Sequence, residues 1–93
     1  MYFVELSVRA QDFLGKLDIK TKERIEKRLK NLESNPFPGD SKFIGRDNNE
    51  GVFRYRIRKF RVLYKVKESQ KIVLVTKIDK RERVYDWQNK GSF

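Results

Sequence analysis

Residues 53–66, FRYRIRKFRVLYKV, alternate between apolar or aromatic side chains and mostly basic ones. An alternation with a period of two is typical of a β-strand with one buried face, and the dipeptide Arg58-Lys59 divides the segment into two such strands. In the resulting hairpin, Arg56 lies directly opposite Arg61. Like charges in opposed positions destabilise a sheet. A chain that keeps cations there is expected to bind a polyanion on that face.

The turn of this predicted hairpin has an unfavourable sequence. Two-residue hairpin turns favour pairs such as Asn-Gly, which adopt positive φ readily, and Arg58-Lys59 does not belong to this group. We therefore expect either a wider loop or a strained turn. A strained turn that carries two cations is itself a candidate functional site.

The whole chain is strongly basic. Its 93 residues include 23 Lys and Arg against 13 Asp and Glu, which gives a net charge of +10. Such an excess favours a phosphate backbone or an acidic protein as partner. A solvated surface of mixed charge, as in thermophilic proteins, is the alternative. It suits residues 20–33, which carry both signs, but not the Arg-only face of the hairpin.

Composition also excludes several kinds of site. The chain has no cysteine and no histidine, so disulfides, thiolate metal sites and histidine acid–base catalysis are excluded. We expect neither a metal nor a cofactor. No apolar run approaches the roughly 20 residues that span a bilayer, and the first residues lack the layout of a signal peptide. We expect a cytoplasmic protein with one domain over residues 1–88 and a flexible tail at 89–93.

The pattern along the chain predicts the order β-α-α-β-β-β. Residues 36–52 hold both prolines and three of the five glycines, so we expect a loop there with at most a short strand at 42–44. The predicted class is α+β, with a helical hairpin packed on a curved, mainly antiparallel four-stranded sheet. Its elements are a strand at 2–6, a helix capped by Ser7, a helix at about 19–34 capped by Asp18, the two hairpin strands, and an apolar strand from 72 to about 79.

A second basic segment, residues 79–87, contains Tyr85. RNA cleavage through the 2′-hydroxyl needs a base, cations that stabilise the crowded phosphorane, and an acid for the leaving oxygen. Nearby positive charge lowers the pKa of a phenol, and Arg binds phosphate in a fixed bidentate geometry. One Tyr with an Arg cluster is therefore a minimal nuclease site. A basic surface that only binds RNA is the simpler interpretation.

Several segments, in this order, resemble the RelE/ParE toxin superfamily. They are FIG at 43–45, GVFRYRI at 51–57, FRVLY at 60–64, and an Arg followed four residues later by Tyr, which are Arg81 and Tyr85. The resemblance is to the RelE-like mRNA interferase branch and covers nearly the whole chain. RelE-like members are endoribonucleases that enter the ribosomal A site, cut mRNA there, and are held in check by a cognate antitoxin.

The resemblance implies a role for each of five residues. Arg54 and Arg56 match basic positions that hold and neutralise the scissile phosphate. Arg61 matches the arginine that stabilises the transition state, and Arg81 the arginine that protonates the leaving group. Tyr85 matches the tyrosine that acts as base or as a stacking platform for the target base.

Four further basic residues are candidate RNA contacts: Arg58, Lys59, Lys80 and Arg83. The chain departs from the family pattern at two of them. Arg58 stands where many members have Gly at the hairpin turn, and Lys80 where many have His. Lys80 can contact phosphate but is a poor proton donor at pH 7 unless its pKa falls.

Two other functions compete with RNA cleavage. ParE-like members of the superfamily poison DNA gyrase and generally lack the clustered catalytic basic residues, so the Arg and Tyr set favours the RelE-like side. A non-catalytic RNA- or ribosome-binding module would use the same cationic face without cutting. The expected partners are the ribosome, mRNA and an acidic or amphipathic antitoxin segment, which would bind the Arg face, a sheet edge or the helices.

Overall fold

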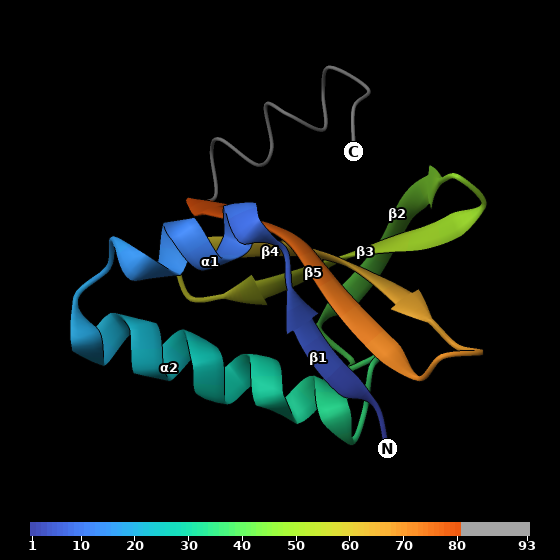
Figure 1. Ribbon diagram of the computed structural model, residues 1–93, viewed down its shortest axis with the longest axis horizontal. Coiled ribbons are helices and arrows are strands. Elements are labelled where there is room, and N and C mark those ends of the chain that lie inside the picture. The colour runs from blue at the N-terminus through green and yellow to red at the C-terminus, as the bar shows by residue number, and fades with distance from the viewer. Residues whose placement is uncertain (81–93) are drawn as a thin grey trace.

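The computed structural model describes residues 1–80, which form one five-stranded sheet with two helices packed against it (Figure 1). The elements are β1 (Phe3–Leu6), α1 (Val8–Gly15), α2 (Ile19–Lys30), β2 (Ser41–Asp47), β3 (Glu50–Ile57), β4 (Phe60–Lys67) and β5 (Ile72–Lys80). The strand order is β1-β5-β4-β3-β2, with β1 parallel to β5 and all other neighbours antiparallel. The predicted α+β class and helical hairpin are confirmed, but the predicted number of strands was one too low.

The additional strand is β2, in the segment that was expected to be mainly a loop. It spans Ser41–Asp47 and pairs with β3 through a turn at Asn48 and Asn49, whose φ values are 52° and 65°. Asn tolerates this left-handed conformation better than most residues. A bulge between Phe43 and Gly45, which has a φ of 153°, shifts the register and breaks the alternation of side chains. The bulge and the preceding prolines conceal the strand from pattern analysis.

Both helices begin at the predicted capping residues. The Ser7 hydroxyl accepts a hydrogen bond from the Ala10 N–H at 3.1 Å, and the Asp18 carboxylate accepts from the Thr21 N–H at 3.1 Å. The hydrogen bonds from Thr21 also lower the pKa of Asp18. The end of α2 differs from the expected residue 34, because the chain tightens into a 3₁₀ turn at Asn31–Glu33. Such tightening is common in the last turn of a helix.

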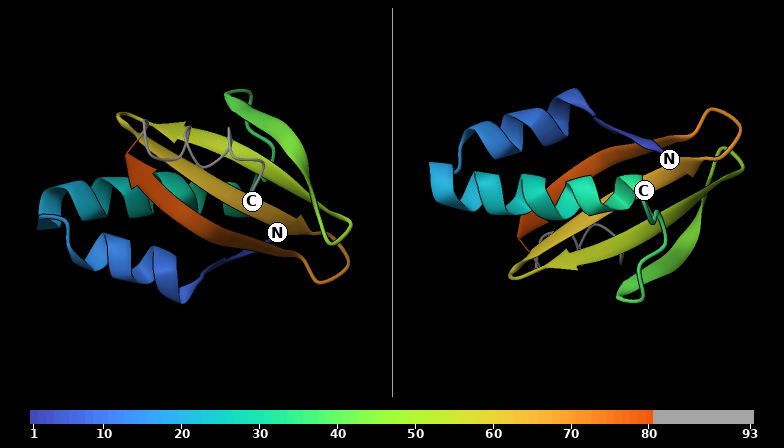
Figure 2. Two further views of the ribbon diagram at one scale, coloured as in Figure 1. Left: turned by 90° about the horizontal axis from the view of Figure 1, so that it is seen from above. Right: turned by 90° about the horizontal axis from the view of Figure 1, so that it is seen from below.

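The core lies between the helices and one face of the sheet (Figure 2). Each helix contributes one apolar stripe, as the sequence periodicity predicts. Among residues 1–80, no helix is long and apolar enough to cross a membrane. The buried core residues are Ala10, Leu14, Ile25, Leu29, Leu32, Tyr55, Ile57, Phe60, Val62, Tyr64, Val73, Val75 and Ile78.

The β3–β4 hairpin has the predicted register. Arg56 is the cross-strand partner of Arg61, and Ile57 that of Phe60, so the turn consists of two residues. Arg58 has a φ of 55°. For a side chain without special tolerance this conformation costs about 1 kcal/mol. Of the two predicted alternatives, the strained turn is therefore the one found.

Candidate nucleic-acid interface

Arg54, Arg56 and Arg61 extend from the sheet face that points away from the helices. Arg54 and Arg56 alternate along β3 with the buried core residues Tyr55 and Ile57, and Arg61 lies on β4 between the buried Phe60 and Val62. Successive side chains of a strand point to opposite faces, so burial of one set directs the other outward. The hydrophobic pattern of the hairpin thus determines where its guanidinium groups lie.

These arginines line a cavity of about 530 Å³ at the open edge of β3. The first residue pair between β2 and β3 is Ser41 with Tyr55, so the last two residues of β3 extend beyond β2. Within the described part of the chain the cavity has six cationic residues and one acidic residue, hence a net charge of +5. They are Arg28, Asp40, Lys42, Arg54, Arg56, Arg58 and Arg61. We call this the cationic cavity. A concave site of one sign concentrates the field and attracts anions.

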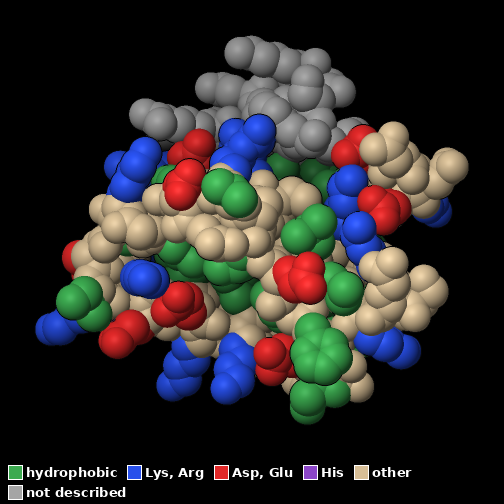
Figure 3. Space-filling model, in the orientation of Figure 1, with side chains coloured by type: hydrophobic (Ala, Val, Ile, Leu, Met, Phe, Trp, Pro, Cys, Tyr) green, Lys and Arg blue, Asp and Glu red, His purple; other side chains and the backbone are tan. Residues whose placement is uncertain are grey.

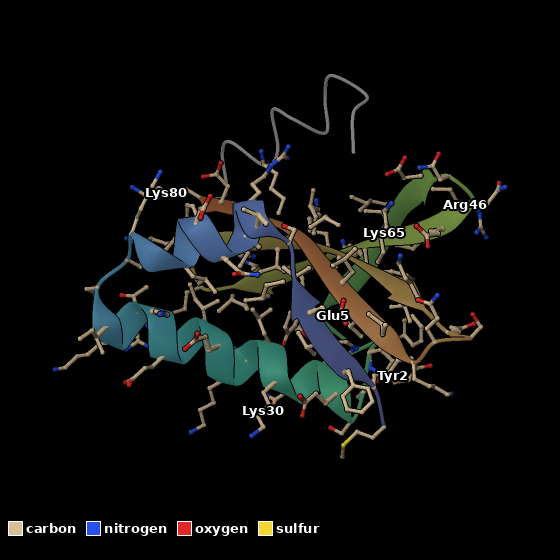
Figure 4. The ribbon with its side chains drawn as sticks, viewed as in Figure 1. Tyr2, Glu5, Lys30, Arg46, Lys65 and Lys80 are labelled. Carbon is tan, nitrogen blue, oxygen red and sulfur yellow. The ribbon has the colours of Figure 1, made fainter. Side chains whose placement is uncertain are left out.

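The excess charge is local to this end of the hairpin. At the other end, the Lys65 Nζ lies 2.9 Å from an Asp47 carboxylate oxygen and 3.2 Å from one of Glu50 (Figure 4). These partners raise the pKa of Lys65. The helical face carries Lys and Arg interspersed with Asp and Glu (Figure 3). Mixed charge is therefore found away from the cavity, whereas the cavity is almost purely cationic.

Arg61 is the only charged residue in the described part of the chain that is buried, with 6% of its surface exposed. Its cross-strand neighbours are Arg56 on β3 and Asp79 on β5. A guanidinium held on the middle of a sheet is restricted in position, and such preorganised charge stabilises an anion without reorganisation of the protein. Arg56 is exposed and Arg54 is half-buried, so the three arginines line the cavity at different depths.

Arg28 enters the cavity from α2. Its Nε donates a hydrogen bond to the Tyr55 hydroxyl at 3.2 Å, and its guanidinium carbon lies 5.4 Å from the centroid of the Tyr55 ring. Its terminal nitrogen lies 3.4 Å from an Asp40 carboxylate oxygen. Tyr55 therefore orients Arg28, while Asp40 is an internal anion that a bound phosphate would have to compete with.

Sequence reasoning missed three of the seven lining residues: Arg28, Asp40 and Lys42. Arg28 directly precedes Leu29 and so flanks the apolar stripe of α2, which is the signal that could have identified it. Asp40 and Lys42 lie in the segment that was interpreted mainly as a loop. Lys42 is the cross-strand partner of Arg54, a relationship that exists only because β2 forms.

The predicted site residues are only partly brought together. Arg54, Arg56, Arg58 and Arg61 line the cationic cavity. Lys59 lines a neighbouring cavity that it shares with Arg58.

The remaining predicted residues lie elsewhere. Lys80 is exposed and pairs with Phe60, which places it near the hairpin turn, but it does not line the cationic cavity. Arg81, Arg83, Tyr85 and the predicted tail 89–93 lie outside the described residues. Among residues 1–80, no group of three or more Asp, Glu, His or Cys side chains is arranged to hold a metal ion.

Comparison with known proteins places this fold in one family. Residues 4–85 match the family model described as "ParE toxin of type II toxin-antitoxin system, parDE". A protein of Methanocaldococcus jannaschii named "Putative toxin RelE1" is 32% identical over 83 residues, which are 88% of this chain and 92% of that protein.

Solved structures agree with this result. The archaeal RelE–RelB complex of Pyrococcus horikoshii OT3 matches with a TM-score of 0.77 at 24% identity, covering 88% of this chain and 97% of the other. The intact E. coli RelBE toxin–antitoxin complex matches with a TM-score of 0.73 at 25% identity, covering 89% and 100%. The match of the family model to most of the chain, together with these RelE relatives, shows that this protein belongs to the ParE toxin family of type II toxin–antitoxin systems and to the RelE-like branch of the RelE/ParE superfamily.

Proposed function

We propose that this toxin is a metal-independent endoribonuclease that cuts mRNA in the ribosomal A site and so inhibits translation. The cationic cavity carries the proposal, because six cations and a single carboxylate around one concavity suit a polyphosphate backbone. Three of these cations, Arg54, Arg56 and Arg61, occupy positions to which the RelE resemblance gives roles in cleavage. Cytoplasmic localisation follows from action on the ribosome.

The reaction assigned to this site is an in-line attack of the ribose 2′-oxygen on the adjacent phosphorus. The P–O5′ bond breaks, leaving a 2′,3′-cyclic phosphate and a free 5′-hydroxyl. Arg54 and Arg56 hold the phosphate, and Arg61 stabilises the additional negative charge of the phosphorane. Tyr85 takes the 2′-hydroxyl proton or stacks on the target base, and Arg81 supplies a proton to the 5′-oxygen.

A toxin of this kind needs an antitoxin. Two of the solved neighbours are a RelE–RelB complex and a RelBE toxin–antitoxin complex. We assign this chain a cognate antitoxin whose acidic or amphipathic segment neutralises the toxin. Removing the charge of Arg54 and Arg56 should weaken that complex in a salt-dependent manner if the segment covers the cationic cavity. If neither the substitutions nor the salt concentration changed the affinity of the complex, the antitoxin would bind elsewhere.

Primer extension on an mRNA incubated with the purified toxin tests the proposal directly, with and without ribosomes. We expect cuts only with ribosomes, their loss in Tyr85→Phe, and ribosome binding close to that of the wild type in this variant. Tyr2→Phe removes a hydroxyl next to the start of β1, outside the cationic cavity, and serves as the matched control. Equal loss of cutting and ribosome binding in Tyr85→Phe would contradict the assigned role.

Two alternatives make different predictions in the same samples. Gyrase inhibition is supported by the description of the matching family model as a ParE toxin. It predicts no RNA cleavage but loss of DNA supercoiling by gyrase at stoichiometric toxin. A non-catalytic RNA-binding module predicts salt-dependent ribosome binding without cuts, and no change on Tyr85→Phe.

A further inference from the structure

A second cavity adjoins the cationic cavity on the helix side of the hairpin turn. It has a volume of about 320 Å³ and lies between the first half of α2 and the β3–β4 turn. Its apolar residues are Ile25, Ile57 and Phe60, each at most 3% exposed. The other residues that line it are Thr21, Arg24, Arg58 and Lys59. The cavity thus combines an apolar floor with three cations at its rim and no acidic residue among those described.

The two cavities form consecutive parts of one surface. Arg24 lines the second cavity and Arg28 the cationic cavity, and residues four apart on a helix lie one above the other on the same face. Arg58 lines both. Because β3 extends beyond β2 at this end, no strand within residues 1–80 covers the edge between the two cavities.

We propose that this second cavity binds the base of a nucleotide next to the phosphate held in the cationic cavity. The inference rests on the proposed function, because it takes single-stranded RNA as the ligand. An unstacked base offers two apolar ring faces and a polar edge, and it is flanked by phosphates on either side. Ile25, Ile57 and Phe60 form the floor of the cavity. The aliphatic stems of the three rim cations can pack against the ring, and their charged ends suit the flanking phosphates. A volume of 320 Å³ lies at the low end of the range for small-ligand cavities, about 300–1,000 Å³.

The arrangement favours RNA over an acidic peptide. A single strand of RNA presents phosphate and flat ring in regular alternation. The two cavities match this alternation, because the cationic cavity is lined by charged residues and the second cavity has an apolar floor. Arg58, which lines both, can contact the phosphate that connects the two ligand groups. An acidic peptide could bind to the cations, but it does not present charged groups and flat rings in this regular alternation.

The test uses fluorescence anisotropy with the full-length toxin, a short single-stranded RNA, and the same RNA with one abasic nucleotide placed at each position in turn. For the wild type we expect one abasic position to weaken binding about tenfold, which lies within the range measured for one stacked base. Thr21→Tyr fills the cavity, so intact RNA should bind about tenfold more weakly and the abasic and intact RNAs should bind alike. Ile19→Tyr places the same ring on an exposed residue of α2 and should behave as the wild type.

A second pair of variants avoids reliance on cavity filling. Arg24→Gln should weaken RNA binding and lower the salt slope, whereas Lys27→Gln, an exposed α2 residue that lines neither cavity, should not. Equal effects of the two would overturn the inference, as would abasic RNA that binds the wild type as tightly as intact RNA at every position.

One further variant separates this inference from the proposed function. If Arg54→Gln leaves the RNA affinity unchanged, the cationic cavity is not an RNA site, and the proposed function is wrong as well. Affinity that falls in Arg54→Gln but not in Thr21→Tyr overturns only the base site. If Thr21→Tyr abolished binding of an acidic peptide but left RNA binding unchanged, the cavity would belong to a protein partner. That result would also overturn the inference of a base site.

Discussion

Arg56 of β3 and Arg61 of β4 are direct cross-strand partners, so two arginine side chains leave the sheet from opposed positions, where a sheet usually avoids like charges. A second pair of cations, Lys42 and Arg54, stands beside them. Arg61 is buried while Arg56 is exposed. Like charges in opposed positions are expected to destabilise the sheet, and an anion bound between these four cations should offset that repulsion.

Replacement of Arg56 by Gln should therefore increase stability and decrease RNA binding. Relief of the repulsion is expected to raise the free energy of unfolding by about 0.5 kcal/mol at low salt, measured by urea denaturation. The gain should shrink at high salt, because salt screens exposed charges. Loss of one phosphate contact should lower the salt slope of RNA binding by about 0.7. Lys27→Gln is the control; a similar gain in that variant would show that the effect is not specific to the pair.

Arg58→Gly should likewise increase stability, by relieving strain in the turn, while it decreases RNA binding. Glycine adopts the φ of 55° at this position without steric cost. After allowance for the greater entropy of the unfolded chain, we expect a net gain of about 0.5 kcal/mol by thermal or urea unfolding. RNA affinity should fall, because Arg58 lines both cavities. Lys59→Gly should instead lower stability, since among the described residues with positive φ the turn contributes Arg58 but not Lys59. A loss in both variants would argue against strain at Arg58.

Asp40→Asn should strengthen RNA binding with little change in stability. The ion pair between Asp40 and Arg28 has side chains that are 56% and 40% exposed, so its removal is expected to alter the free energy of unfolding by less than about 1 kcal/mol. The cavity loses its only described carboxylate, and repulsion of the incoming phosphate is reduced. We expect affinity for a short RNA to rise by about two- to fivefold at low salt. Weaker binding would mean that Asp40 serves mainly to position Arg28.

Tyr64 should govern part of the alkaline stability. Burial raises the pKa of Tyr64 above its ordinary value of 10.0, so the folded state holds the phenol proton at pH values where the unfolded chain has released it. Stability from this group is thus fully present below pH 10 and declines as pH rises toward the higher pKa of the folded state.

Tyr64→Phe tests this dependence through urea unfolding at a series of alkaline pH values. The variant should lose about 1 kcal/mol at neutral pH, because the Tyr64 hydroxyl donates a 2.7 Å hydrogen bond to the buried Pro36 carbonyl. Its stability should then decline less steeply than that of the wild type above pH 10. Equal slopes for Tyr64→Phe and the wild type would exclude this role.

Local chemistry was sufficient to predict most of the fold. The alternation in residues 53–66 predicted the hairpin, its register and the pairing of Arg56 with Arg61, because strand pairing follows directly from which side chains are buried. The caps at Ser7 and Asp18 were predictable for the same reason: each hydrogen bond closes within three residues. The full length of β2 was not predictable, because a bulge between Phe43 and Gly45 interrupts the period of two that identifies a strand, and the preceding prolines favour a loop.

The composition of the cavity could be known only in part from the sequence. The arginines of β3 and β4 follow from the hairpin alone, so that half of the site was determined by the sequence pattern. Arg28 and Lys42 join them through contacts between elements far apart in the chain: Arg28 bonds the Tyr55 hydroxyl, and Lys42 pairs with Arg54. Sequence periodicity reports which face of an element is buried, but not which other element's flank will lie beside it. The sequence pattern alone therefore determines the cationic hairpin. Tertiary packing decides that the hairpin becomes part of a cavity and that a second cavity forms beside α2.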